Sequence, residues 1–277
     1  MALIIGLDIG GTTTKIIGFE DGNLFGFVRV KASDAFTSAS GGLGKFLNVT
    51  GKQLQDVEQI YATGVGASLL SGDLFGCPTK IVPEFDCVGL GGLYLSGLDQ
   101  AVVVSMGTGT SIVAARGRQV EHVIGSGVGG GTLQGLAERI LNVHEFETIA
   151  SMADQGVLGM VDLTVGDITS AKIPGLTADA TASNFGKLAD LAQPQDLAAG
   201  IVNLVFQSVG TASVLAARLQ SLDKVVITGN LSQISLGKRV LDGFSKLYNL
   251  DFIIPKHAEF ATAVGASIIR SVNNEID

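Results

Sequence analysis

The sequence predicts an α/β protein built from two similar halves that face each other across a cleft. Apolar runs of strand length alternate with longer segments of helical periodicity, which is typical of this class. A pattern of three short strands near the start of the chain recurs roughly a hundred residues later, with a Gly/Thr turn at the same place. The strands of the two patterns are expected at residues 3–7, 15–19, 24–30, 102–105, 111–115 and 120–124.

Helices are expected after each group of strands, because apolar residues recur there at three- and four-residue spacing. They cover residues 84–97, 130–141, 146–154, 197–219, 231–248 and 260–277. We therefore expect an N-terminal α/β domain of residues 1–98 and a second α/β domain of residues 99–257. The C-terminal helix, residues 258–277, is a candidate to return to the first domain.

The composition is that of a compact globular protein. Of the 277 residues, 46% are hydrophobic and 16% are charged, and the mean hydropathy is +0.43, which excludes a mainly disordered chain. The 26 acidic and 18 basic residues give a formal net charge of −8, and no basic stripe is present. This charge argues against nucleic acid and against anionic membranes as partners.

Other features favour a cytoplasmic protein. Cys77 and Cys87 are the only cysteines, and we expect both to be buried core residues in a reducing compartment. The first residues, MALIIGLDIGG, have no basic region and predict a core strand, not a signal peptide. No apolar run is expected to reach the ~20 residues that a membrane helix needs.

Two matched Gly/Thr turns are the strongest candidates for a binding site. The first is Gly10-Gly11-Thr12-Thr13, and the second is Gly107-Thr108-Gly109-Thr110. A tight glycine turn places several backbone N–H groups on one side of a loop, and threonine hydroxyls add donors, so such a turn can bind phosphate. One such turn alone is better explained as a plain hairpin. Two turns at the ends of two matched strands favour a nucleotide whose phosphate chain is held from both sides.

Three ionisable residues lie close to these turns in the expected fold. Asp8 ends the first strand, where it can hold Mg²⁺ directly or through water, and Lys15 can reach phosphate oxygens. Glu84 lies where a buried strand gives way to a helix, next to Asp86. It could accept a proton from a substrate hydroxyl, or simply stabilise the helix N-terminus after Pro83. The residues alone favour these two interpretations equally.

A glycine-rich segment, GSGVGGGTLQGL at residues 125–136, precedes an expected helix, where its amides could meet an anion. It also satisfies G-x-G-x-x-G, but the strand before it belongs to an antiparallel pattern, which weakens a dinucleotide interpretation. The chain contains no G-x-x-x-x-G-K-[ST], so a P-loop is excluded. The polar segment at residues 177–187 fits an ordered loop at a site or interface, and equally a solvated connection.

The motifs resemble those of a known superfamily. DIGGT at residues 8–12, the second Gly/Thr turn and VVITGN at residues 225–230 resemble the two phosphate motifs and the adenosine motif of sugar kinases, actin and heat-shock chaperones. More narrowly, PEFDCVGLGG, VSMGTGTSI, GVGGGTLQGL and ATASNFGK resemble the type II pantothenate kinases. The resemblance implies a two-domain actin-like ATPase fold, which is ribonuclease H-like, with a duplicated β-meander plus helices and an interdomain nucleotide cleft.

The resemblance also implies an activity. It is the ATP-dependent phosphorylation of the primary hydroxyl of pantothenate to 4'-phosphopantothenate, the first step of coenzyme A biosynthesis, by a homodimer that uses Mg²⁺. Glu84 would be the general base, with Asp8 and Lys15 as the other catalytic residues. The residues implied to bind ATP and its phosphates are Asp8, Gly10, Gly11, Thr12, Thr13, Lys15, Gly107, Thr108, Gly109, Thr110, Gly129, Gly130, Gly131, Thr132, Gln134, Phe146, Gly229 and Asn230.

The acceptor site departs from the family pattern. The family usually has an Arg shortly before the glycine cluster, whereas this chain has Glu121 and His122 there. Histidine is a weaker and pH-dependent cation, so pantothenate's carboxylate is held less firmly, or the substrate is a neutral relative such as pantetheine. The loop at residues 181–186 would lie near the substrate or a dimer contact. The candidate substrate contacts are His122, Thr181, Ala182, Asn184 and Phe185.

Two other functions stay open. A sugar kinase of the same superfamily would share both turns, although the repressor-like sugar kinases normally add a clustered-cysteine zinc site that this chain lacks. A nucleotide-binding regulatory module would keep the fold without turnover, and the missing Arg supports it.

Overall fold

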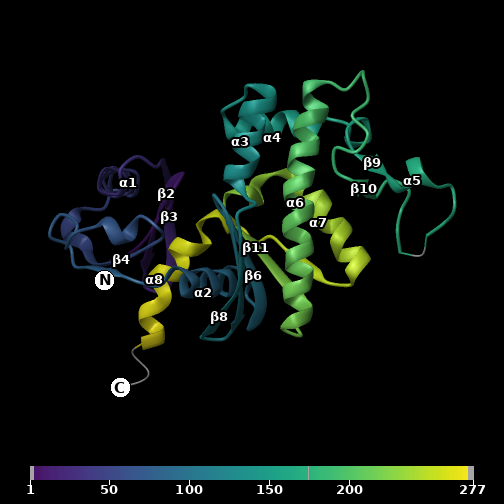
Figure 1. Ribbon diagram of the computed structural model, residues 1–277. Coiled ribbons are helices and arrows are strands. Elements are labelled where there is room, and N and C mark those ends of the chain that lie inside the picture. The colour runs from purple at the N-terminus through teal and green to yellow at the C-terminus, as the bar shows by residue number, and fades with distance from the viewer. Residues whose placement is uncertain (1–2, 174, 274–277) are drawn as a thin grey trace.

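The computed structural model describes residues 3–173 and 175–273, and it contains two five-stranded sheets with the same strand order (Figure 1). In each sheet three strands form an antiparallel meander, and two later strands extend the sheet in parallel from the first of the three. The expected α/β class and the expected repeat are therefore confirmed.

The first sheet has the order β3-β2-β1-β4-β5, with β1 (Leu3–Ile9), β2 (Thr13–Glu20), β3 (Asn23–Lys31), β4 (Val57–Thr63) and β5 (Thr79–Ile81). The second has the order β8-β7-β6-β11-β12, with β6 (Gln100–Met106), β7 (Thr110–Arg116), β8 (Gln119–Ser126), β11 (Lys224–Thr228) and β12 (Asp251–Ile253).

Helices cover the faces of both sheets. Helix α1 packs on β2 and β3 of the first sheet, and α6 and α7 pack on the second sheet. Helices α3 and α4 pack on α6 beyond the end of the second sheet, and α2 and α8 lie between the two sheets (Figure 1). The helices are α1 (Ala35–Thr50), α2 (Glu84–Ser96), α3 (Gly130–Leu141), α4 (Phe146–Gln155), α6 (Pro194–Leu219), α7 (Ser235–Tyr248) and α8 (Ala261–Asn273). Residues 274–277 of the expected C-terminal helix lie outside the described residues.

Helices α2 and α8 each pack on the sheet of the opposite half. Helix α2 precedes the second sheet in the chain, yet its buried residues Val88 and Leu93 pack against strands of that sheet. Helix α8 follows the second sheet, yet it crosses β1 of the first, where Gly6 lies directly against the carbonyl of Ala263. The two halves therefore share their central helices, and the division of the chain at residue 98 remains a prediction.

The two helices contact each other backbone to backbone. A Cβ added at Gly91 of α2 would overlap the carbonyl of Ala261, and one added at Gly265 of α8 would overlap the carbonyl of Cys87. Glycine allows this approach because it has no side chain. This close contact joins the two halves of the molecule.

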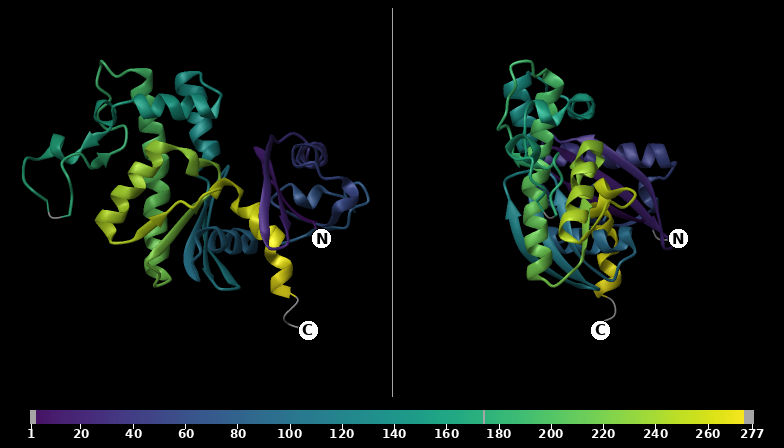
Figure 2. Two further views of the ribbon diagram at one scale, coloured as in Figure 1. Left: turned by 180° about the vertical axis from the view of Figure 1, so that it is seen from behind. Right: turned by 90° about the vertical axis from the view of Figure 1, so that its right-hand side faces the viewer.

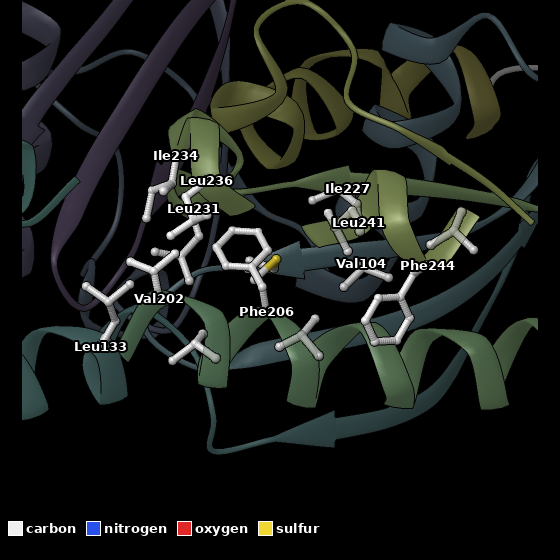
Figure 3. Close-up of a cluster of buried hydrophobic side chains, with 14 of the residues drawn as sticks. Val104, Leu133, Val202, Phe206, Ile227, Leu231, Ile234, Leu236, Leu241 and Phe244 are labelled. Atoms are coloured by element: carbon white, nitrogen blue, oxygen red, sulfur yellow. The ribbon is translucent and has the colours of Figure 1, made fainter. Parts of the chain in front are cut away.

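The largest core lies under α6. Phe206 is fully buried, and Figure 3 shows its ring among side chains that include Val104 of β6 and Leu231, which follows β11. One expectation from the sequence is wrong here. By length and composition alone, the 26 residues of α6 could cross a membrane, although 67% of its most apolar window is buried inside the molecule. Its apolar residues instead form this core.

An arm projects from the second half, away from the rest of the molecule (Figures 1 and 2). It comprises residues 157–173 and 175–192 and carries only short elements. These are a 3-10 helix (Leu158–Met160), β9 (Leu163–Thr164), α5 (Val165–Ile168) and β10 (Thr181–Ser183), and none of them was expected from the sequence.

The contact between α2 and α8 yields a test of stability. Replacing Gly91 by Ala should destabilise the protein by about 1–3 kcal/mol, because the added methyl group overlaps backbone that cannot move aside. The matched control is Gly44→Ala on α1, where an added Cβ meets nothing and the change should stabilise by up to about 1 kcal/mol. Chemical denaturation of both variants measures the difference. Equal stabilities would contradict the close contact.

Candidate active site

The two Gly/Thr turns meet where the halves of the chain face each other. The first turn joins β1 to β2 and the second joins β6 to β7, so both occupy the same place in the repeat. The Oγ1 atoms of Thr12 and Thr108 share a hydrogen bond of 3.0 Å between the turns. Within the first turn, the N–H of Gly10 donates to the carbonyl of Thr13 at 3.1 Å. The turns therefore form one continuous surface.

Two cavities lie on either side of the paired turns. The Glu84 pocket has a volume of about 580 Å³, and the Phe146 pocket has a volume of about 540 Å³. Six residues line both of them: Gly11, Thr12, Thr13, Gly107, Thr108 and Asn230. The remaining predicted residues in the Glu84 pocket are Asp8, Gly10, Lys15, Glu84, Gly109, Thr110, His122 and Gly229. Those in the Phe146 pocket are Gly130, Gln134 and Phe146.

Asp8, Lys15 and Glu84 form an ionisable group in the Glu84 pocket. Asp8 and Lys15 are register partners on β1 and β2, and Oδ2 of Asp8 lies 3.6 Å from Nζ of Lys15. Burial raises the pKa of Asp8, and Lys15 opposes this rise. Burial, and then the charge of Asp8, raise the pKa of Glu84. A carboxylate with a raised pKa accepts a proton more readily, which is what a general base requires.

The helix after Pro83 begins at Glu84 as expected, but the strand before it does not match the expectation. Strand β5 lies at the edge of the first sheet, and most of it is exposed, not buried. The neighbouring carboxylate, Asp86, lines neither pocket. Glu84 is thus the acidic residue of this helix that faces the cavity.

The site offers few protein ligands for a metal ion. Within residues 3–173 and 175–273, no group of three or more His, Cys, Asp or Glu side chains could hold one. Mg²⁺ commonly uses one or two carboxylates, with water and substrate phosphates completing its shell. Asp8 fits this pattern, because its buried carboxylate has a raised pKa and, among the described residues, Lys15 at 3.6 Å is the cation paired with it.

Gly229 and Asn230 reach from the second half to the first turn. Gly229 directly follows β11 with φ +87°, and a Cβ there would overlap the backbone of Met106, so this position requires glycine. The Nδ2 of Asn230 donates to Oγ1 of Thr13 at 3.1 Å. The predicted adenosine motif thus lies beside the first turn, between the two cavities.

The start of α3 differs from the expectation that its amides are free to meet an anion. The N–H of Gly130 donates to the carbonyl of Gly107, and the N–H of Gly131 donates to that of Thr108, both at 2.8 Å. Gly129, Gly131 and Thr132 line neither pocket. The N–H groups of Gly130 and Gly131 therefore support the second turn, and these two hydrogen bonds keep them from donating to an anion.

The Phe146 pocket combines predicted residues with two basic residues that were not predicted. Gln134 and Phe146 line it from α3 and α4, and the Nε2 of Gln134 donates to the carbonyl of His144 at 3.0 Å. Opposite them lie Arg29 and Lys31 of β3. The only signal in the sequence was a pair of alternating basic residues on a strand, which does not reveal a partner in the other half.

Four of the predicted substrate contacts lie elsewhere. Thr181, Ala182, Asn184 and Phe185 line neither pocket, and their expected place near the substrate or a dimer contact remains a prediction. They belong to the arm, where the fully buried carboxylate of Asp162 holds Thr181, Asn184 and Phe185. Its oxygens accept hydrogen bonds from the N–H of Phe185 at 2.8 Å, Nδ2 of Asn203 at 2.6 Å, Nδ2 of Asn184 at 3.3 Å and Oγ1 of Thr181 at 3.4 Å.

His122 does lie in the Glu84 pocket, with an apolar surface beside it. Its ring stacks on Phe85, with centroids 4.1 Å apart and planes 10° from parallel. Val65, which is 70% exposed, lines the same pocket. Phe85, in the first turn of α2, and Val65, in the turn after β4, were also missed, because a single exposed apolar residue has no distinctive pattern in a sequence.

Comparisons with known proteins agree with this geometry. Residues 100–268 match the model of the Fumble family. A protein named type II pantothenate kinase from Bacillus anthracis is 30% identical over 278 residues, which cover 96% of this chain and 97% of that protein.

Solved structures share the fold at low identity. The 2-hydroxyisocaproyl-CoA dehydratase activator of Clostridium difficile, solved with ADPNP, has a TM-score of 0.71 and 19% identity, and the match covers 99% of this chain and 98% of that one. A ROK family glucokinase from Streptomyces griseus, solved with glucose and AMPPNP, has a TM-score of 0.61 and 13% identity, with 97% and 99% coverage. These likenesses confirm the actin-like ATPase and sugar kinase fold. The sequence matches show further that the chain belongs to the Fumble family, together with the type II pantothenate kinases that it resembles.

Proposed function

We propose that this protein is an ATP-dependent kinase that phosphorylates the primary hydroxyl of pantothenate to 4'-phosphopantothenate, the first step of coenzyme A biosynthesis. One observation carries the proposal: two matched turns meet between two cavities, and a carboxylate suited to be a base lies in one of them. A relative named type II pantothenate kinase, matched over 96% of the chain, supplies the substrate class.

In this proposal the Phe146 pocket binds the nucleoside of ATP, and the Glu84 pocket binds the acceptor. ATP places its nucleoside in the Phe146 pocket, where Gln134, Phe146 and Asn230 lie. Its phosphates cross the paired turns and end in the Glu84 pocket. The backbone N–H groups and threonine hydroxyls of the turns then donate to phosphate oxygens without reorganisation.

Phosphoryl transfer needs mainly positioning and charge stabilisation. Lys15 stabilises charge on the transferred phosphoryl group, and Asp8 would hold Mg²⁺ directly or through water. Mg²⁺ supplies neutralisation of phosphate charge when bound. Glu84 orients the acceptor hydroxyl and takes its proton as oxygen attacks the γ-phosphorus and the bond to the β-phosphate oxygen breaks.

The walls of the Glu84 pocket bear on the choice of acceptor. Val65 and Phe85 offer apolar surface, which suits the gem-dimethyl carbon next to pantothenate's hydroxyl better than it suits a sugar. The charged residues are Asp8, Glu84 and Lys15, and Lys15 lies beside Asp8. His122 is then the group left to meet the carboxylate of pantothenate. This favours pantetheine, which lacks that carboxylate, as a second candidate acceptor.

The arm supports the proposed homodimer. Its exposed apolar side chains include Ile168 at 63%, Leu188 at 51% and Leu191 at 77% exposure, and burial against a second copy would remove them from water. We place the protein in the cytoplasm, where ATP is available and its two buried free cysteines stay reduced. Nucleic acid and membranes are not expected as partners, given the net charge of −8.

Replacing Glu84 by Gln should lower kcat with pantothenate by roughly 10²–10⁴-fold, because the proton acceptor is lost. ATP affinity should stay unchanged. The wild-type rate should fall at acidic pH as the raised pKa of Glu84 is crossed, since protonated Glu84 cannot act as a base. A coupled ADP-release assay across pH measures both effects, with Asp86→Asn as control. Wild-type turnover in the Gln variant would remove Glu84 from the mechanism.

Replacing His122 by Arg should raise kcat/KM for pantothenate roughly tenfold, because a permanent cation pairs with the carboxylate. Pantetheine is the internal control, and its kcat/KM should change little. The two acceptors, with glucose as a third, are compared in the same assay. An equal gain for both acceptors would show that His122 does not meet the carboxylate.

In light scattering, the protein should have twice the 28.4 kDa mass of one chain. The double variant Leu188→Asp/Leu191→Asp should shift it to a monomer, because charges replace the apolar surface of the arm. Leu219→Asp, at the 73% exposed end of α6, is the matched control. A wild-type mass of one chain would contradict the dimer, and a double variant that stays dimeric would exclude the arm as its interface.

A further inference from the structure

Two ion pairs join the halves of the chain beside the Phe146 pocket. Nη2 of Arg29 lies 3.3 Å from Oε1 of Glu147, and Nζ of Lys31 lies 3.3 Å from Oε1 of Glu145. The basic residues come from β3 in the first half, and the acidic residues come from the start of α4 in the second. All four line the pocket.

The geometry of the two elements sets the pairs side by side. Arg29 and Lys31 alternate along β3, so their side chains leave the same face of the strand. Glu145 is the residue before α4, and Glu147 lies in its first turn, where a negative charge is favourable. The pairs therefore bracket Phe146, which lies between the two glutamates in the chain and lines the same pocket.

We propose that these two ion pairs form a clasp across the Phe146 pocket, which positions the start of α4 over the bound nucleotide and slows nucleotide release. The inference rests on the proposed function, because it takes the Phe146 pocket as the nucleotide site. Arg29, Lys31, Glu145 and Glu147 are positioning residues in this scheme. They act through Phe146 and not on the reacting atoms.

The clasp can open without unfolding the protein. The halves stay joined by the backbone contact of α2 and α8, which involves none of the clasp residues. The pairs are exposed to solvent, so each contributes little and salt weakens it. Loss of both should therefore speed nucleotide dissociation by only about three- to tenfold. A weak clasp of this size suits a site that must release ADP at each turnover.

The acidic members of the clasp separate this role from direct phosphate binding. In Glu145→Gln/Glu147→Gln, the clasp is lost while the cations Arg29 and Lys31 remain. If these cations simply bind phosphate, freeing them from their partners should slow release or leave it unchanged. If they hold the clasp, release should become faster. The direction of the change therefore decides between the two roles.

Stopped-flow displacement of a fluorescent N-methylanthraniloyl ATP analogue measures this rate on the full chain. We expect dissociation about three- to tenfold faster in the double Gln variant than in wild type. Added salt should speed dissociation from wild type more than from this variant, because the variant has no clasp for salt to weaken. A variant in which the charges of one pair are exchanged, Arg29→Glu/Glu147→Arg in an otherwise wild-type chain, should keep the wild-type dissociation rate. Arg239→Gln/Asp154→Asn removes a similar exposed pair that includes a residue of α4 but lines neither pocket, and it should not change the rate.

Each outcome bears on one proposal or both. Unchanged or slower release in the double Gln variant overturns the clasp but leaves the kinase assignment intact. A wild-type protein that binds no ATP analogue overturns the proposed function and the clasp together. Thermal unfolding of each variant shows whether it is folded. If the double Gln variant does not fold, the variant with the exchanged charges still tests the clasp.

Discussion

The backbone contact between α2 and α8 is the constraint on which the rest of the structure depends. Each of these helices packs on the sheet of the opposite half, so the two sheets cannot separate without exposing both helices. Gly91 and Gly265 permit the approach, because any side chain there would force the helices apart. With the halves held in this way, the turns at the ends of β1 and β6 meet at Thr12 and Thr108.

The meeting of the turns explains why there are two cavities. The turns and Asn230 form a common boundary, so groups on either side stay separate although one ligand could span both. The carboxylates of Asp8 and Glu84 lie on one side. Arg29 and Lys31, matched by two glutamates, lie on the other. One side of the site can thus bind a nucleotide while the other side holds the acceptor and the groups that react with it.

The sequence predicted those features of the fold and site that local backbone chemistry determines. The strand repeat, the glycine turns and the helix that starts at Glu84 all follow from patterns within a few residues. Apart from the meeting of the two turns, contacts between distant segments were not predictable. The amides of Gly130 and Gly131 bond to a turn more than twenty residues earlier, and Arg29 pairs with a glutamate 118 positions away. Nor could the sequence predict that buried Asp162, which no pattern marks, holds Thr181, Asn184 and Phe185 in the arm.

Charge in the Glu84 pocket limits which acceptors it can select. Two carboxylates face one lysine there. Burial raises the pKa values of Asp8 and Glu84, because it disfavours the ionised form of each carboxyl group. A divalent cation held at Asp8 would offset part of this negative charge, whereas Glu84 on the acceptor side would keep its charge. An anionic acceptor must therefore place its own charge away from Glu84, toward His122 at the stacked aromatic edge. Selectivity at this site thus depends on where the acceptor carries its charge as much as on its shape.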